Sequence, residues 1–400
     1  MISSISIQGF KSYKSLKDFS LRPLNVLIGP NRSGKTNFLD FWDLLSEAGK
    51  QQLSRAINKR GGVNAVISWN QETTLKFELH SDIREASSQA TGFDYIGEIA
   101  KQHYSYDVAL EQLFTSSRNS GAQSNRSQLL NLDHSKGWIY NRLTGKNEER
   151  EGNLQTTELA VAQVRDAAAY PNLDVFRRYL SNLTVHRPFN TSDDAPIRDA
   201  QLVGVRDAEL PPTRLSRRGD NLTNVLYFLH NELKYQDYYD EYLFTLQRAF
   251  PSFEKLLFPA EGGQGKTVVA WKDRNFPGRA ITANLLSDGT LRFMCLLAAL
   301  YDPEPPSLLC LDEPEENLHP QLVRLLVSVL HEASERMQII VATHSPELIS
   351  YLENADDVVV VEAEEGWSTL RRLSQKELQH WLEAYSLGEL WESGEIGGRL

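Results

Sequence analysis

Three short apolar runs in the chain each end in a polar loop. They are LNVLI (24–28), LLCL (308–311) and IIVA (339–342). A continuous apolar run of this length, bounded by turn residues, is typical of a buried strand. After the first loop, apolar residues recur at helical spacing in 38–45. The pattern therefore predicts an α/β fold with a mainly parallel core sheet wrapped by helices.

The long region between the first run and the other two has a different pattern. Alternating or aromatic-rich segments predict antiparallel strands of a side sheet at 73–81, 95–112 and 136–145. The polar segment 116–128 predicts a loop. Helices are expected at 156–169, 173–183 and 221–250, the last capped by Asp220 or Asn221. Two further strands are expected at 266–273 and 279–286.

The loop after the first apolar run carries the full G-x-x-x-x-G-K-[ST] pattern of a P-loop. Its residues are Gly29, Pro30, Asn31, Arg32, Ser33, Gly34, Lys35 and Thr36. The two glycines let successive backbone N–H groups face one anion, and the helix N-terminus adds its dipole. We expect Lys35 to reach the β- and γ-phosphates of ATP and Thr36 to ligate Mg²⁺. The flanking strand and helix disfavour the alternative, a chance match in a turn.

The second apolar run ends in two acids, Asp312 and Glu313. Burying charge is costly without a partner, so a strand that ends in two carboxylates needs a use for them. Beside a P-loop, Asp312 is expected to hold Mg²⁺, and Glu313, which points the other way, to polarise the attacking water as general base. The alternative is that both acids cap a helix that starts near Pro320.

The third run ends in Thr343 and His344. A lone histidine is usually structural, but the carboxyl end of a strand is where open α/β sheets bind ligands. His344 is therefore expected to donate to the γ-phosphate or to the attacking water.

A fourth feature is the segment LLSDGTLRFM (285–294), in which small polar residues run directly into an apolar helix. Ser287, Asp288 and Thr290 are all suitable N-cap residues, and these residues alone favour a simple helix cap.

Taken together, these motifs resemble the ABC-type ATPases of the RecF/SMC kind. The chain looks most similar to the stand-alone bacterial predicted ATPases related to the ATPase half of the OLD nucleases. The motifs that carry the resemblance are IQGFKSYKSL, GPNRSGKTNFLD, LLSDGTLRFMCLLAAL, LCLDEPEENLHP, VATHSPELI and LGELWESGEIGGRL. The resemblance makes 285–294 the signature segment and 316–319 the D-loop. It implies that two heads pair head to tail and that one signature caps the other head's ATP. The Ser287 hydroxyl and the N–H groups around Gly289 would then donate to the γ-phosphate at the positive end of the helix. Asp288 departs from the glycine of transporters, which leaves its own role open.

The resemblance implies an ABC-type ATPase head with a helical signature lobe. We divide the chain into an N-terminal ATPase lobe (1–80), an inserted side sheet with helices (81–185) and a C-terminal ATPase lobe (186–400). The expected cofactors are ATP and Mg²⁺. The expected partners are a second copy, or a larger homo-oligomer, and a separately encoded nuclease or toxin-like effector in anti-phage defence or genome maintenance. One alternative is an ATP-bound scaffold that sequesters a toxin-like effector with little turnover, and a transporter subunit is another.

The composition of the chain bears on DNA as a candidate partner and on the role of the cysteines. The net charge of −11 means that bulk charge does not hold the chain on DNA, which stays a candidate partner only through a local basic patch. The basic groups 176–180 and 217–221 are the candidates, and solvated helix faces are the simpler reading. Two cysteines, Cys295 and Cys310, lie in apolar runs and are expected to be core residues.

Sequence patterns of membrane, coiled-coil, nuclease and transporter proteins are missing from the chain or weak in it. No apolar run is long enough for a signal peptide or a membrane span, so we expect no membrane association and a cytoplasmic location. No heptad run persists, so the long coiled-coil arm of SMC relatives is not expected. The segment after Pro346 is too short for a nuclease domain. Gln71 is only a weak candidate for a transporter Q-loop, which weakens the transporter reading.

Overall fold

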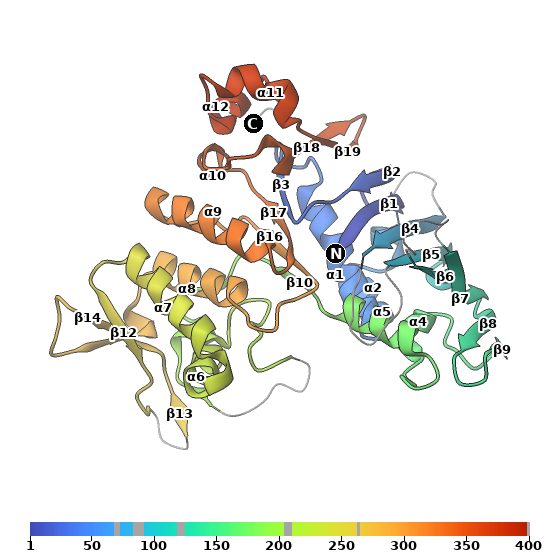
Figure 1. Ribbon diagram of the computed structural model, residues 1–400, viewed down its shortest axis with the longest axis horizontal. Coiled ribbons are helices and arrows are strands. Elements are labelled where there is room, and N and C mark those ends of the chain that lie inside the picture. Colours follow the sequence, from blue (N-terminus) through green and yellow to red (C-terminus); the bar gives the residue numbers. More distant parts are fainter. Residues whose placement is uncertain (68–72, 83–91, 118–124, 204–209, 262–264, 398–400) are drawn as a thin grey trace.

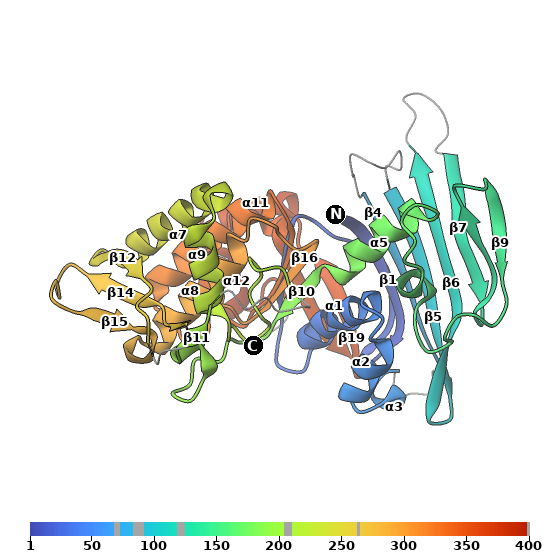
Figure 2. The ribbon, with the colours of Figure 1, turned by 90° about the horizontal axis from the view of Figure 1, so that it is seen from below.

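The computed structural model describes residues 1–67, 73–82, 92–117, 125–203, 210–261 and 265–397. Gln71 and part of the predicted loop 116–128 lie outside these residues. Figure 1 shows two lobes on either side of a central sheet: a side sheet built from the first part of the chain and a helical lobe built from its later part. Figure 2, turned by 90°, shows the same two lobes at opposite ends of the molecule.

The central sheet has the strand order β10-β16-β17-β3-β18-β19. Its strands are β10 (Leu183–His186), β16 (Leu308–Asp312), β17 (Gln338–Ala342), β3 (Leu24–Ile28), β18 (Val358–Glu364) and β19 (Trp367–Arg372). Neighbouring strands are parallel except the last pair, β18 and β19, which form a hairpin. The three apolar runs are therefore adjacent strands, and the predicted mainly parallel core sheet is confirmed.

The central sheet separates two hydrophobic cores, because successive residues of a strand face opposite sides. In β3, Val26 and Ile28 face the core of the helical lobe, and Leu27 faces the core of the side sheet. The two cysteines follow the same division, since Cys295 lies in the first core and Cys310 in the second. Both thiols are buried and unpaired, as expected of core residues.

The side sheet is antiparallel, with the strand order β2-β1-β4-β5-β6-β7-β8-β9. Its strands are β1 (Ile2–Phe10), β2 (Tyr13–Ser20), β4 (Thr74–Ser81), β5 (Gly92–Gln102), β6 (Ser105–Ser117), β7 (Asn125–Asp133), β8 (Lys136–Asn141) and β9 (Lys146–Arg150). It is larger than the sequence pattern indicates, because it includes the first two strands of the chain. The boundary drawn at residue 80 falls at the end of β4, which pairs with β5 in the same sheet.

Helix α1 (Lys35–Gly49) is packed between the two sheets. It is buried on nearly all sides, and its aromatic residues Phe38, Phe41 and Trp42 are fully buried in the side-sheet core. Short helices flank it, namely α2 (Leu53–Lys59), α3 (Val63–Val66), α4 (Ala160–Gln163) and α5 (Pro171–Ser181). This packing on both sides fixes the start of α1 relative to the central sheet.

One predicted helix of this region is wrong. The segment 156–169 forms only the single turn α4, after which Val164 is extended. The buried Glu111 carboxylate caps the start of α4 by accepting the N–H groups of Ala160 and Val161 at 2.6 and 2.9 Å. Further along, Oδ1 of Asp166 accepts the N–H groups of Ala168 and Ala169, both at 3.0 Å, in place of helix bonds, so the alanine-rich segment does not continue as a helix.

The helical lobe holds the predicted helix 221–250 as α6 (Leu222–Asn231) and α7 (Gln236–Ala249), joined by a 3₁₀ turn at Leu233–Tyr235. It also holds α8 (Asp288–Leu300) and α9 (Pro320–Ser334). Its small strands are β11 (Gln201–Leu202), β12 (Phe253–Leu257), β13 (Lys266–Thr267), β14 (Ala270–Asp273) and β15 (Ala280–Thr282). The predicted strand 279–286 is wrong in its second half, because Ala283–Leu285 is a 3₁₀ turn, closed by the Leu286 N–H that donates to the Ala283 carbonyl at 3.2 Å. Three short helices complete the chain, α10 (Pro346–Ser350), α11 (Gln375–Leu382) and α12 (Leu387–Glu392).

Within the described residues, no helix is both long enough and apolar enough to cross a bilayer.

Candidate active site

The P-loop joins β3 to α1, and both of its glycines have backbone angles that favour glycine. Gly29 has φ +148° and Gly34 has φ +113°. A Cβ atom at Gly29 would collide with the Val361 carbonyl of β18, and one at Gly34 with the Ser368 side chain of β19. The phosphate loop therefore lies directly against the last hairpin of the central sheet, a contact that allows no side chain at either position.

The P-loop forms one wall of a cleft of about 740 Å³. The lining residues come from several parts of the chain, namely Lys11 and Ser12, 31–37, Arg60 and Ala65, Glu313, His344, and 365–367. The structure thus brings Glu313 and His344 to the same cleft as the P-loop, although they lie about three hundred positions away in sequence. None of the described residues 285–290 of the signature segment lines this cleft.

Lys35 is buried at the centre of this cleft. Its Nζ donates to the carbonyl oxygens of Gly29 and Pro30, at 2.6 and 3.2 Å, and lies 3.4 Å from Nδ1 of His344. Burial lowers the pKa of the Lys35 ammonium to about 8, against the smaller raising effect of nearby carboxylates, first of all Glu313. The lysine that is expected to meet the phosphates is therefore a cation close to its titration point.

This lowered pKa predicts a pH dependence of ATP affinity. ATP binds the charged lysine, so above pH 8 the protein must first take up a proton, and the affinity should fall toward a limit of about tenfold per pH unit. Below about pH 7.5 it should be flat. Isothermal titration between pH 7 and 10 measures this effect. Lys35→Arg stays charged in this range and should show no such slope. An identical slope in both proteins would assign the effect to another group.

Glu313 and His344 contact each other across adjacent strands. Nε2 of His344 lies 3.3 Å from Oε1 of Glu313. Glu313 follows β16 with the unusual φ of +48°, and its N–H donates to the carbonyl of Ala342 in β17 at 2.8 Å. The backbone of Glu313 is thus fixed by the neighbouring strand β17. Its unusual φ angle lies at a candidate catalytic position, where backbone strain is often found.

The charges around this pair suit proton transfer. Burial, and then the nearby Asp312 and Glu316, raise the pKa of Glu313, which makes its carboxylate a better base. Burial and Lys35 lower the pKa of His344, so the imidazole is neutral at pH 7. Because Lys35 faces Nδ1, this network assigns the ring proton to Nε2, from which it can donate toward Glu313.

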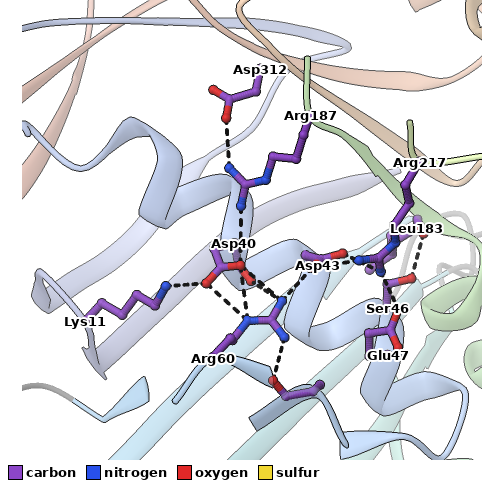
Figure 3. Close-up of polar contacts among 11 residues, drawn as sticks. Lys11, Asp40, Asp43, Ser46, Glu47, Arg60, Leu183, Arg187, Arg217 and Asp312 are labelled. Atoms are coloured by element: carbon purple, nitrogen blue, oxygen red, sulfur yellow. Dashed lines mark hydrogen bonds and ion pairs between the residues drawn. The ribbon is translucent and has the colours of Figure 1, made fainter. Parts of the chain in front are cut away.

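Asp312 lies in an ion-pair network that the sequence does not indicate (Figure 3). Arg187, which follows β10, places Nη1 2.8 Å from Oδ2 of Asp312 and Nη2 3.4 Å from Oδ1 of Asp40 in α1. Although burial by itself raises the pKa of Asp40, Arg60 and Lys11 hold that pKa below its usual value. Arg187 therefore links the end of β16 to a carboxylate in α1 that stays ionised.

Thr36 and Asp312 fit the chemistry of Mg²⁺, which prefers a hydroxyl and a carboxylate among oxygen ligands. Thr36 is exposed at the start of α1, and the Asp312 carboxylate ends the neighbouring β16. No cluster of three or more carboxylate, histidine or cysteine ligands exists among the described residues.

The basic groups considered for nucleic acid make ion pairs within the chain. Arg217 lies 2.5 Å from Asp43 and also pairs with Glu47 (Figure 3). In α5, Arg177 and Arg178 pair with Asp174 at 2.5 and 3.0 Å. These contacts favour the interpretation of both groups as solvated helix faces rather than nucleic-acid contacts.

The signature segment has the geometry of a helix cap, because Oγ of Ser287 accepts the N–H of Thr290 at 3.3 Å and α8 begins at Asp288. It also contacts the D-loop of the same chain. A Cβ atom at Gly289 would lie 2.6 Å from the Asn317 carbonyl, so Gly289 is needed for this close approach. Arg292 in α8 donates to the carbonyl and carboxylate of Glu316, at 3.0 and 2.7 Å.

Arg198 positions the loop before α8 and gives Asp288 a role. The Arg198 side chain is buried and pairs with Asp288 at 2.5 Å. It also donates to the carbonyls of Leu286, Ala283 and Thr191 at 2.8, 3.2 and 2.9 Å. A guanidinium is suited to such a site because its donors point in fixed directions. Asp288 is therefore held by Arg198 of the same chain.

Sequence reasoning missed both Arg187 and Arg198. A signal existed for Arg187, because LTVH (183–186) is a short strand and the arginine follows its carboxyl end, as Asp312 and His344 follow theirs. No local signal identifies Arg198, whose partners lie up to 90 positions away.

Comparison with known proteins gives two kinds of match. The sequence profile of the family described as "AAA domain, putative AbiEii toxin, Type IV TA system" matches residues 24–350. No curated protein sequence matches the chain.

Among solved structures, one similar chain is the Smc head bound to the C-winged helix domain of ScpA. It is 12% identical, with a TM-score of 0.54 over 95% of this chain and 99% of that one. Another is the Smc head domain with an extended coiled coil bound to the C-terminal domain of ScpA, derived from Pyrococcus furiosus. It is 11% identical, with a TM-score of 0.50 over 96% and 98%. At this identity the matches show the fold, which is that of an SMC-type P-loop ATPase head, as the sequence motifs predict.

Proposed function

We propose that this chain, which belongs to the AAA domain family that matches residues 24–350, binds and hydrolyses ATP with Mg²⁺ as a head-to-tail dimer. The observation that carries the proposal is the shared cleft. It brings the P-loop, Glu313 and His344 together in an SMC-type head. Phosphate binding and water activation require these groups within one site.

The chemistry follows from the side chains of the cleft. Backbone N–H groups of the P-loop and Lys35 bind the phosphates, and Glu313 takes a proton from the attacking water. The single N–H of the neutral His344, on Nε2, orients the Glu313 carboxylate in the free chain, and with ATP bound it can instead donate toward the charge that develops on the γ-phosphate. Thr36 and Asp312 would hold Mg²⁺, which supplies charge neutralisation at the phosphates when bound.

The dimer is proposed because the signature segment lies outside the cleft of its own chain. Ser287 and the start of α8 can bind a phosphate only in another molecule, and Ser287 is exposed enough to do so. A two-fold pair places each signature over the other cleft and closes both sites at once.

We further propose that ATP-driven pairing controls a separate effector in anti-phage defence or genome maintenance. Two observations support a partner. The family description refers to a putative toxin of a toxin–antitoxin system, and both similar Smc heads are bound to domains of ScpA. The rival function, an ATP-bound scaffold that sequesters a toxin-like effector with little turnover, is favoured by the Arg187–Asp312 ion pair, which engages a carboxylate that hydrolysis needs.

Phosphate release and light scattering test the proposal on the purified chain. With ATP and Mg²⁺ we expect steady phosphate release, and with a non-hydrolysable ATP analogue a doubling of the molar mass. Lys35→Ala should lose both the phosphate release and the ATP-dependent pairing, because the cleft loses the P-loop cation that is expected to meet the phosphates. An ATP-bound dimer without turnover would favour the scaffold. A wild-type chain that binds no ATP would overturn both the ATPase proposal and the scaffold alternative.

A further inference from the structure

The hairpin of β18 and β19 brings an aromatic side chain to the cleft. Its two-residue turn, Glu365 and Gly366, has positive φ at both positions, 52° and 84°, as a tight hairpin turn requires. Trp367 pairs with Glu364 directly after the turn and lines the cleft with a half-buried indole ring. It is the one tryptophan, tyrosine or phenylalanine among the described residues that line this cleft.

The hairpin is fixed to the phosphate loop through Ser368. Its backbone N–H donates to the Ser12 carbonyl at 2.8 Å. Its buried hydroxyl lies 2.6 Å from the Ser33 carbonyl of the P-loop and 2.7 Å from the hydroxyl of Ser12. Because Ser368 adjoins Trp367, the indole is held at a set position relative to the phosphate-binding loop.

A lysine also contacts the ring. Nζ of Lys14 lies 5.6 Å from the ring centroid of Trp367, within the range of a cation–π contact. Lys14 does not line the cleft, whereas Trp367 does. The Lys14 contact therefore adds to the bonds of Ser368 in holding the indole beside the cleft.

The strand order fixes which part of a nucleotide meets this ring. Along the carboxyl edge of the sheet, Glu313 follows β16, His344 follows β17, the P-loop follows β3 and the hairpin extends from β18. The groups that act on the terminal phosphate thus lie on one side of the P-loop. A bound nucleoside triphosphate must extend to the other side, where Trp367 lies.

Resting on the function proposed above, we propose that Trp367 is the residue that recognises the base, by stacking on a purine of a nucleoside triphosphate. Stacking on an aromatic ring needs no hydrogen-bond readout, and it is stronger for the larger π-surface of a purine than for a pyrimidine. The wild-type chain should accordingly bind ATP and GTP more tightly than CTP and UTP.

The test compares two probes that share the phosphates but not the base, ATP and inorganic tripolyphosphate, by isothermal titration. Trp367→Ala should weaken ATP binding about tenfold or more, and leave tripolyphosphate binding unchanged. Trp367→Phe should retain most of the ATP affinity. Trp381→Ala removes an exposed tryptophan of α11 that does not line the cleft, and should change neither affinity.

The outcomes separate this inference from the proposed function. Equal ATP affinity in wild type and Trp367→Ala, with tripolyphosphate still bound, would overturn base recognition by Trp367 and leave the ATPase proposal standing. A wild-type chain that binds neither probe would overturn both. If Trp367→Ala does not fold, the wild-type preference decides, because equal affinity for purine and pyrimidine triphosphates contradicts stacking.

Discussion

Replacing Glu313 by glutamine should lower ATP turnover at least about 100-fold and leave ATP binding unchanged. The amide has nearly the shape of the carboxylate and can still accept a hydrogen bond from Nε2 of His344, but it cannot take a proton from water. Loss of a positioned general base typically costs 10²–10⁴ in rate. Lys35 and the P-loop are untouched, so the variant should accumulate as an ATP-bound dimer.

Phosphate release and size-exclusion chromatography with ATP measure the two effects. Glu335→Gln is a matched control, because it makes the same chemical change at an exposed position at the end of α9. It should behave as wild type. A Glu313→Gln protein that turns over at the wild-type rate would remove Glu313 from the mechanism.

Mixing two inactive variants should restore about a quarter of the wild-type ATPase activity. Lys35→Ala loses its own cleft, and Ser287→Arg blocks closure over the cleft of the other chain with a bulky side chain. In a mixed dimer, one site combines both defects. The other combines an intact P-loop with an intact signature. Random assortment makes about half of the dimers mixed, and each has one good site of two.

Co-refolding or co-expression of the two variants, followed by phosphate release, provides the measurement. Recovery of ATPase activity well below a quarter would mean that ATP hydrolysis requires two intact sites in one dimer. Ser287→Ala is the matched control for the cap seen in the structure, since it removes the bond to Thr290 and should cost about 1 kcal/mol of stability. Full activity of Ser287→Arg alone would show that Ser287 is only a cap in its own chain.

The sequence was sufficient to predict the central sheet and the elements of the site that repeat a local pattern. Asp312, Glu313 and His344 each follow an apolar run, and parallel strands bring their carboxyl ends to one edge. The strand order itself was not predictable, because pairing of β16 with β17 and of β17 with β3 depends on long-range packing. This order is what places the P-loop between Glu313 and Trp367.

Contacts between distant residues account for what the sequence does not reveal. In the sequence, nothing distinguishes Trp367 from other strand residues. Its place beside the cleft depends on the bond from Ser368 to the P-loop, which lies more than 300 positions earlier. Arg198 is likewise one arginine among many until its partners in the loop before α8 are known. The helix predicted at 156–169 begins only at Ala160, where Glu111 of a different strand caps it, and the Asp166 side chain takes the N–H groups of Ala168 and Ala169 that a longer helix would use.

The contacts of Gly289 and Arg292 with the D-loop have a consequence for communication between two copies. The start of α8 and residues 316–317 are held together, so they are expected to move as one rigid body. In a head-to-tail pair this body would meet the other chain's nucleotide at one end, and it adjoins its own Glu313 at the other. Binding or hydrolysis of one nucleotide would then shift Glu313, the general base that activates water at the second nucleotide. Such a pair would hydrolyse ATP cooperatively, with a sigmoidal dependence of rate on ATP concentration.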